Sequence, residues 1–237
     1  MQMLKNFRKA PRGGAGGGAG AAGTAGGGGG IRPRRVTPSP QAADVAAVLP
    51  PVWVEVPTNY REAARWSPSI GEYFPNFAAE STAGKITFHP HVTGHWTIFF
   101  SIAAAFSETC TQELAQLSAV HEDLRREGVK IIGVARNSLA ELHLWSEQIR
   151  KQTGRKVTIP LLADPDGVLT GTFGMIAPLA EENSAIRKTI IISPALKVSM
   201  IFEYPLFISR SIEETLRTLD AAREYHDERE RARRAGY

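Results

Sequence analysis

The sequence predicts an α/β domain in which helices flank a mixed central sheet. Apolar, strand-like runs alternate with helical stretches between residues 96 and 162. Two further strand-like runs, at residues 189–192 and 198–202, are joined by Ser193-Pro194-Ala195-Leu196, which indicates a hairpin. A last helical stretch follows the hairpin. Because alternating strands and helices favour parallel pairing and a hairpin is antiparallel, both kinds of pairing are expected in one sheet.

Hydrophobic periodicity defines each element of this domain in turn. Leu114, Leu117, Val120 and Leu124 recur at a spacing that places them on one face of a helix. Ser211 is the expected N-cap of the last helix, with Glu214 three residues later as its capping-box partner. The elements before the hairpin are expected as a strand at Trp96–Ser101, a helix at Thr111–Arg126, a strand at Lys130–Ala135, a helix at Leu139–Arg150 and a strand at Thr158–Leu162.

The chain is expected to divide at residues 67 and 225. Residues 13–30 contain 12 glycines in 18 positions, and a chain of such high backbone entropy has little to bury. Residues 1–66 are therefore predicted to be a disordered, basic lead-in, with one short helix near Tyr60–Trp66 and a possible edge strand at 52–54. Residues 67–224 are predicted to form the folded domain, and residues 225–237 a charged C-terminal tail.

The charge distribution argues against a nucleic-acid or membrane partner. The first 40 residues hold seven of the 28 Lys and Arg residues and no acid, so the remainder has 21 basic and 24 acidic residues. A body with that balance has no basic surface for phosphates. The longest apolar run, residues 96–106, is too short to span a bilayer. The single cysteine excludes an intrachain disulfide and fits a reducing compartment, so a cytoplasmic location is expected.

That cysteine, Cys110, lies where a strand gives way to a helix. If the helix begins near residues 107–109, unpaired backbone N–H groups and the positive end of the helix dipole favour the thiolate. The thiolate is the nucleophilic form, so this position suits thiol chemistry. A lone cysteine is also commonly a small buried hydrophobe, and position alone does not separate the two interpretations.

Several segments, in order along the chain, resemble the peroxiredoxin family, and its one-cysteine branch in particular. In Ser101–Glu113 (SIAAAFSETCTQE), Phe106, Ser107, Cys110 and Glu113 match the family's active-site loop. Arg187, seven residues before Pro194, falls where the family keeps its catalytic arginine. The other matching segments are Ile70–Phe77 (IGEYFPNF), Asn137–Trp145 (NSLAELHLW), Ile159–Met175 (IPLLADPDGVLTGTFGM) and Tyr204-Pro205 with Arg210.

The resemblance implies a thioredoxin-like fold and a role for each matching residue. Cys110 would attack a peroxide oxygen and become a sulfenic acid. The Ser107 hydroxyl would bond the thiolate and the peroxide, in place of the family's Thr. Arg187 would stabilise the thiolate and the charge on the leaving oxygen. Glu113 and Arg210 would orient Arg187. Without the family pattern, an ordinary surface salt bridge is the simpler interpretation of Arg187.

The resemblance further implies a thiol-dependent peroxidase that reduces hydrogen peroxide and small organic hydroperoxides without a cofactor. With no second cysteine, the sulfenic acid needs an external thiol, such as glutathione or a thioredoxin-like protein, and a homodimer is implied. The sequence departs from the family at Ile102, Ala103 and Glu108, where the branch has His, Pro and Pro. These departures keep open a second hypothesis, a degenerate member that acts as a peroxide sensor or interaction module. A thioredoxin-type reductase is disfavoured because Cys-x-x-Cys is absent.

Histidines suggest no metal site. His89, His91 and His95 form H-x-H-x-x-x-H, and on a strand the first two would share a face. No Cys or acid lies nearby to complete a site, so no metal is expected. His121 and His143 are expected on helix surfaces.

Overall fold

The computed structural model describes residues 67–176 and 186–236. The predicted disordered lead-in, the short helix near Tyr60–Trp66 and the edge strand at 52–54 lie outside the described residues. The described residues form strands β1 (Ala78–Ala79), β2 (Ile86–Thr87), β3 (Trp96–Ile102), β4 (Val129–Ala135), β5 (Leu161–Ala163), β6 (Arg187–Ile192) and β7 (Val198–Tyr204), and helices α4 (Phe88–Val92), α5 (Glu108–Arg126), α6 (Leu139–Thr153), α7 (Val168–Thr172) and α8 (Ile212–Arg234).

The central sheet has the strand order β5-β4-β3-β6-β7 and mixes parallel and antiparallel pairs. β3 runs parallel to β4 and β4 to β5, while β6 is antiparallel to both β3 and β7. The predicted mixed sheet and the hairpin of β6 and β7 are therefore confirmed. β5 begins later than predicted, at Leu161, because the preceding residue is Pro160, which has no N–H to donate to a neighbouring strand.

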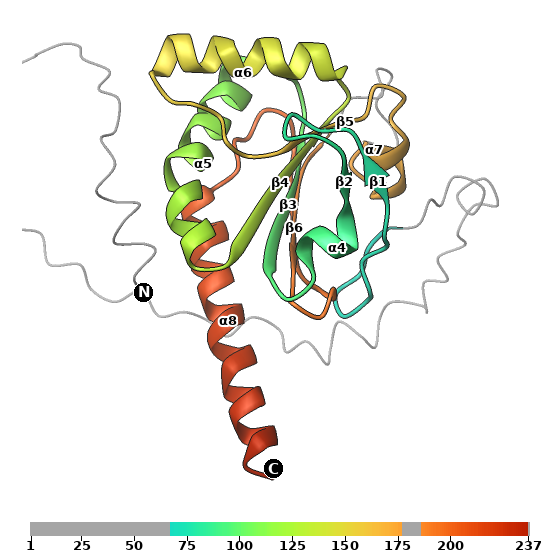
Figure 1. Cartoon of the computed structure of the whole chain (residues 1–237), viewed down its shortest axis with the longest axis vertical. Helices are drawn as coiled ribbons and strands as arrows, with labels where there is room; N and C mark the ends of the chain where they lie inside the picture. Colours follow the sequence, from blue (N-terminus) through green and yellow to red (C-terminus); the bar gives the residue numbers. More distant parts are fainter. Residues whose placement is uncertain (1–66, 177–185, 237) are drawn as a thin grey trace, which may run out of the picture. The chain divides into compact units, whose positions relative to one another are not determined.

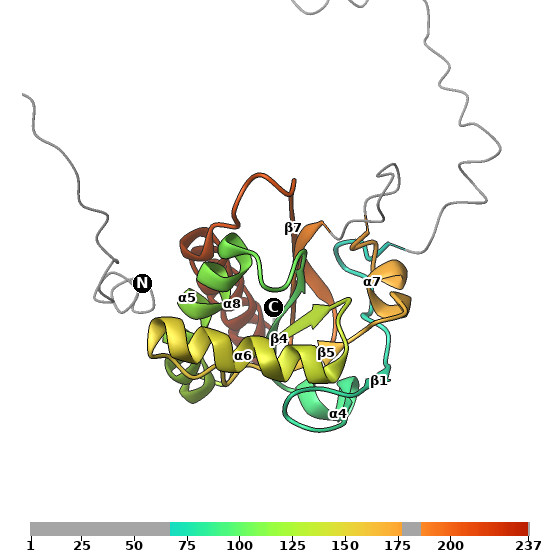
Figure 2. The same cartoon turned by 90° about the horizontal axis from the view of Figure 1, so that it is seen from above.

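Helices cover both faces of this sheet (Figures 1 and 2). α5, α6 and α8 pack on one face, where Leu114, Trp145 and Leu216 join Ile98 and Ile131 of the sheet in one buried cluster. α4 and α7 lie on the other face, over a second buried cluster. Its aromatic rings, from Phe74, Phe77, Phe88, Phe99 and Phe173, contact one another with centroids 4.8–6.1 Å apart. The sheet is thus held rigidly between two apolar layers.

Side-chain caps fix where the long helices begin. Ser138 and Glu141 form a complete capping box at the start of α6, and Gly154 ends that helix in the left-handed conformation. At α8 the Ser211 side chain accepts from the Glu214 N–H, as predicted, while the Glu214 carboxylate bonds Arg217. α8 continues to Arg234, so the boundary predicted at residue 224 falls inside a continuous helix. Its last turns extend past the end of the sheet (Figure 1).

One expectation about histidines was wrong, namely that His121 lies on a helix surface. His89 and His91 lie on the short helix α4. His121 is buried, and its Nδ1 lies 2.7 Å from the Thr158 hydroxyl. The spacing of Leu117, His121 and Leu124 already places His121 on the buried face of α5. His143 is exposed, as expected. Within residues 67–176 and 186–236, no helix is both long and apolar enough to cross a membrane.

The burial of His121 predicts a pH dependence of stability. Burial lowers the pKa of this imidazole; Glu122 opposes the effect, and Arg125 and Lys130 add to it. An unfolded histidine takes up a proton at about pH 6.5, whereas folded His121 does so only at lower pH. Above about pH 6.5 the ring is neutral in both states and contributes no pH dependence. Below that pH the unfolded state binds more protons, so His121 lowers the free energy of unfolding.

We expect His121→Asn to lose less stability than the wild type between about pH 7.5 and about pH 5.5. Urea unfolding at each pH measures the difference. His143→Asn, which changes an exposed histidine, is the matched control and is expected to follow the wild type. Equal losses in wild type and His121→Asn would contradict the prediction.

Candidate active site

Cys110 lies in the first turn of α5, as the sequence predicted. Ser107 is the N-cap of the helix, and its side chain accepts a hydrogen bond from the Cys110 N–H at 3.3 Å. The cysteine is 3% exposed, so its sulfur is almost completely withdrawn from water. The N–H groups of this first turn have no partner within the helix. They lie at the end of α5 that carries the sulfur, and they favour a negative charge there.

The Ser107 hydroxyl forms its hydrogen bonds with main-chain groups in this structure. It donates its one proton to the Ala104 carbonyl, at 2.8 Å, while it accepts from the Cys110 N–H. The predicted contact with the thiolate would need that same proton. Ser107 therefore lies at the site, but its observed hydrogen bonds fix the backbone around Cys110 rather than the sulfur.

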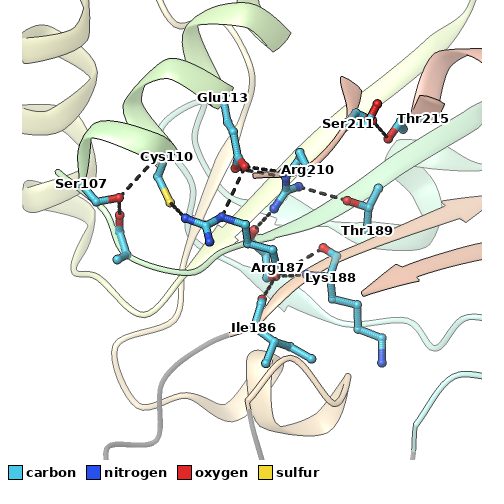
Figure 3. Close-up of polar contacts among 12 residues, drawn as sticks. Ser107, Cys110, Glu113, Ile186, Arg187, Lys188, Thr189, Arg210, Ser211 and Thr215 are labelled. Atoms are coloured by element: carbon cyan, nitrogen blue, oxygen red, sulfur yellow. Dashed lines mark hydrogen bonds and ion pairs between the residues drawn. The ribbon is translucent and has the colours of Figure 1, made fainter. Parts of the chain in front are cut away.

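Arg187 is the charged group that reaches the sulfur (Figure 3). It is the first residue of β6, and its Nη2 lies 3.8 Å from Cys110 Sγ. A second guanidinium nitrogen, Nη1, donates to the carbonyl of Leu206. β6 pairs with β3, the strand that leads into the Cys110 loop, so the sheet itself brings together two residues 77 positions apart. The structure excludes the simpler interpretation of Arg187 as a surface ion pair, because the side chain is buried.

Glu113 joins Arg187 to Arg210. It follows Cys110 by three residues and so lies on the same side of α5. Its Oε1 is 3.3 Å from Arg187 Nε and its Oε2 is 3.2 Å from Arg210 Nε. Oε1 also accepts from the Arg210 backbone N–H at 2.8 Å. One buried carboxylate thus lies between two buried guanidinium groups, as Figure 3 shows.

Several groups besides Glu113 contact the Arg210 side chain. It donates to the Thr189 hydroxyl at 3.1 Å and to the Ser101 carbonyl at 2.6 Å, and it lies over the Phe100 ring. Burial lowers the pKa of its guanidinium, while Glu113 and the Cys110 sulfur act in the opposite direction. Because an arginine in a protein keeps its proton, Arg210 presents a fixed positive charge to the Glu113 carboxylate.

The arginines of this cluster outnumber its carboxylate. Arg187 and Arg210 carry two positive charges and Glu113 one negative charge, and the Arg187 guanidinium lies next to the Cys110 sulfur. The site can therefore stabilise negative charge that develops at the sulfur. Glu108, two residues before Cys110, is exposed and bonds Gln112.

An aromatic contact supports the loop before Cys110. Phe106 has the left-handed φ of 67°, and its ring lies 6.1 Å from that of Trp145, which in turn donates to the Thr111 hydroxyl at 3.0 Å. Trp145 therefore contacts Phe106 and Thr111, both close to Cys110 in the sequence, and its fluorescence can report on the oxidation of the cysteine. Sequence reasoning missed the contacts from Thr189, Thr111 and the Leu206 carbonyl; a main-chain oxygen, in particular, leaves no signal in a sequence.

No group of three or more His, Cys, Asp or Glu side chains that could hold a metal ion occurs among the described residues. His89 Nε2 instead contacts the Phe74 carbonyl, at 2.7 Å, and His95 Nδ1 contacts the Gly128 carbonyl, at 3.0 Å. Each of these two rings therefore contacts a main-chain carbonyl.

Comparison with known proteins agrees with this geometry. A sequence model described as the AhpC/TSA family matches residues 70–201. Peroxiredoxin 2 of Caldanaerobacter subterraneus is 34% identical over 65% of this chain and 69% of its own length. The 1-Cys peroxiredoxin PER1 of Triticum aestivum is 32% identical over 65% and 72%, respectively. The solved structure of yeast mitochondrial 1-Cys peroxiredoxin has a TM-score of 0.62 and 26% identity, over 67% of this chain and 78% of that one.

Removing the Glu113 charge is expected to destabilise the fold. Glu113→Gln removes the one carboxylate that the two buried guanidinium groups share, which costs about 3–5 kcal/mol in the free energy of unfolding. Glu147→Gln, which breaks an exposed ion pair with Arg150, is the matched control and should change stability by less than about 0.5 kcal/mol. Urea unfolding measures both. A loss in Glu113→Gln as small as that of the control would mean that the charge network does not stabilise the fold.

Proposed function

Because the chain belongs to the AhpC/TSA family, we propose that it is a thiol-dependent peroxidase with Cys110 as its nucleophile. The observation that carries this proposal is the 3.8 Å contact between Cys110 Sγ and Arg187 Nη2 in the first turn of α5. The substrates are hydrogen peroxide and small organic hydroperoxides, and the activity is that of an antioxidant enzyme. No cofactor takes part in the steps below.

The first step is attack of the Cys110 thiolate on one peroxide oxygen. An S–O bond forms as the O–O bond breaks, and the cysteine is oxidised to a sulfenic acid. The leaving oxygen takes a proton and departs as water or an alcohol. Arg187 carries out the electrostatic part: its permanent charge stabilises the thiolate and then the charge that develops on the leaving oxygen. Glu113 and Arg210 act through Arg187, as positioning residues.

Ser107 positions Cys110 in the resting site, and its hydroxyl has a second role, to donate a hydrogen bond to the peroxide. Its cap to the Cys110 N–H holds the first turn of α5 in place. If the hydroxyl releases the Ala104 carbonyl when peroxide binds, its proton becomes available to the peroxide. The family resemblance at Ser107 supports this exchange.

An external thiol returns Cys110 to its reduced form, since the chain has one cysteine. A first thiol attacks the sulfenic acid, forms a mixed disulfide and releases water. A second thiol attacks that disulfide, and two thiols leave as an oxidised pair. We propose glutathione or a thioredoxin-like protein as the reductant. The yeast mitochondrial 1-Cys peroxiredoxin resolves its thiol via the glutathione and thioredoxin systems.

We further propose a cytoplasmic homodimer. A reducing compartment fits a protein whose function needs a free thiol. Among the described strands β7 pairs only with β6; on its other side its first residue, Val198, bonds Gly71 and Glu72, and such a partly open strand edge can pair with another chain. Light scattering at several concentrations is expected to give twice the chain mass. A monomer at all concentrations would contradict the dimer and leave the peroxidase chemistry untouched.

A second candidate is a degenerate peroxiredoxin that acts as a sensor or interaction module. Ala103 and Glu108 in the loop, and a Ser107 hydroxyl bonded to Ala104, favour it. In such a protein Cys110 would be oxidised slowly and would then remain as a sulfenate or a mixed disulfide. The rate of Cys110 oxidation separates the two candidates.

Stopped-flow fluorescence of Trp145 during mixing with hydrogen peroxide is the measurement that tests the peroxidase. Cys110→Ser should abolish the reaction, and Arg187→Ala should slow it by at least about a hundredfold, the usual effect of removing one charge-stabilising donor. Arg187→Lys keeps the charge but not the fork of donors, so its rate should lie between those of the wild type and Arg187→Ala. Arg150→Ala, at an exposed arginine, is the matched control.

Trp145→Phe assigns the fluorescence signal, and mass spectrometry of the sulfenic acid provides a second readout. A slow reaction that Arg187→Ala does not change would favour the sensor instead.

A further inference from the structure

Three consecutive apolar side chains are exposed between β7 and α8. Leu206, Phe207 and Ile208 are 44%, 87% and 46% exposed, and we call them the apolar segment. Single exposed apolar residues need no explanation, but a contiguous group commonly marks a binding surface. Figure 2 shows the loop that carries them arching away from the end of β7 before it enters α8. Core packing therefore does not account for these residues.

The apolar segment is fixed to the reacting groups at both of its ends. At one end the Leu206 carbonyl accepts from Arg187 Nη1, and Arg187 Nη2 reaches Cys110 Sγ. At the other end, two residues after Ile208, the Arg210 N–H donates to Glu113. Within the segment, the Ile208 N–H bonds the Pro205 carbonyl at 3.0 Å. These main-chain contacts tie the backbone of the apolar segment to the Arg187 guanidinium and to Glu113.

A further exposed apolar residue comes from the loop that precedes the cysteine. Phe106 is 37% exposed and lies directly before Ser107, the N-cap of the helix that carries Cys110. Its left-handed backbone and its contact with Trp145 fix its position. Exposed apolar groups thus flank the site in both loops that supply its backbone, one ahead of the sulfur and one at the arginine.

We propose that the apolar segment, with Phe207 as its main residue, binds the apolar substituent of alkyl and aryl hydroperoxides and sets a preference for them over hydrogen peroxide. The inference rests on the peroxidase function proposed above. In a substrate ROOH, the two oxygens must lie at Cys110 Sγ and Arg187, so R extends away from the sulfur. Hydrogen peroxide has no such group and gains nothing from an apolar surface.

The test compares oxidation rates of Cys110 with hydrogen peroxide, tert-butyl hydroperoxide and cumene hydroperoxide. We expect Phe207→Ser to slow the reaction with cumene hydroperoxide about tenfold, or about 1.4 kcal/mol, because the aryl group loses its apolar contact. The rate with hydrogen peroxide should stay within about twofold, since the Leu206 carbonyl that Arg187 binds is unchanged. The loss with tert-butyl hydroperoxide should be intermediate.

Ile70→Ser is the matched control. Ile70 is 68% exposed, and its neighbour Gly71 bonds Val198, at the opposite end of β7 from the apolar segment. This variant should leave all three rates unchanged. Ile208→Ser provides a second variant within the segment and should resemble Phe207→Ser with a smaller effect.

Three results would overturn the inference. An equal loss with all three peroxides would mean that Phe207 positions Arg187 rather than binding substrate. Unchanged rates together with loss of the dimer would assign the segment to a second copy of the chain. Unchanged oxidation with slower reduction by thioredoxin would assign it to the reductant. Failure of the proposed function looks different: the wild type would then oxidise no faster than a free thiol with any of the peroxides.

Discussion

The carboxylate of Glu113, between the guanidinium groups of Arg187 and Arg210, is the interaction on which the rest of the site depends. It lies on α5, one arginine begins β6, and the other precedes α8. Arg210 extends the network to the β3 backbone through the Ser101 carbonyl. Three parts of the chain therefore meet at one buried anion, and Arg210 connects them to β3. A buried charge stabilises a fold only when it is fully paired, so the network specifies one arrangement of these elements.

This network also places fixed positive charge beside a buried sulfur. Arg187 and Arg210 carry two positive charges against the one negative charge of Glu113, and the positive N-terminal end of α5 lies at the same place. The position of the charge matters as much as its presence, because Leu206 and Glu113 together aim the Arg187 guanidinium at the sulfur. The apolar segment enters the site through the same Leu206 carbonyl, which links the surface of the domain to its reacting atoms.

Local patterns in the sequence predicted the elements whose burial is regular. The apolar spacing in α5 and the alternation of strands and helices led to the mixed sheet, and dispersed motifs led to five residues that the structure brings together around Cys110. Prediction was wrong where one residue overrides the pattern: Pro160 delays β5, and His121 occupies an apolar helical face. The contacts of Thr189 and of the Leu206 carbonyl could not be predicted, because they depend on how the β7–α8 loop folds back over β6. The Ser107 hydroxyl was placed correctly, but its bond to Ala104 follows from a turn that the sequence does not specify.

The loop before Cys110 shows how the fold can hold this turn without the proline that the family has at position 103. A left-handed conformation at Phe106 costs about 1–2 kcal/mol for a residue with a side chain. Two contacts offset that cost: the ring of Phe106 packs on Trp145, and Ser107 bonds Ala104 and the Cys110 N–H. Proline restrains a loop through its own ring, whereas these contacts restrain it through tertiary packing and a helix cap. Rigidity at Cys110 therefore depends on α6, which carries Trp145, and the reactivity of the cysteine is coupled to the docking of that helix.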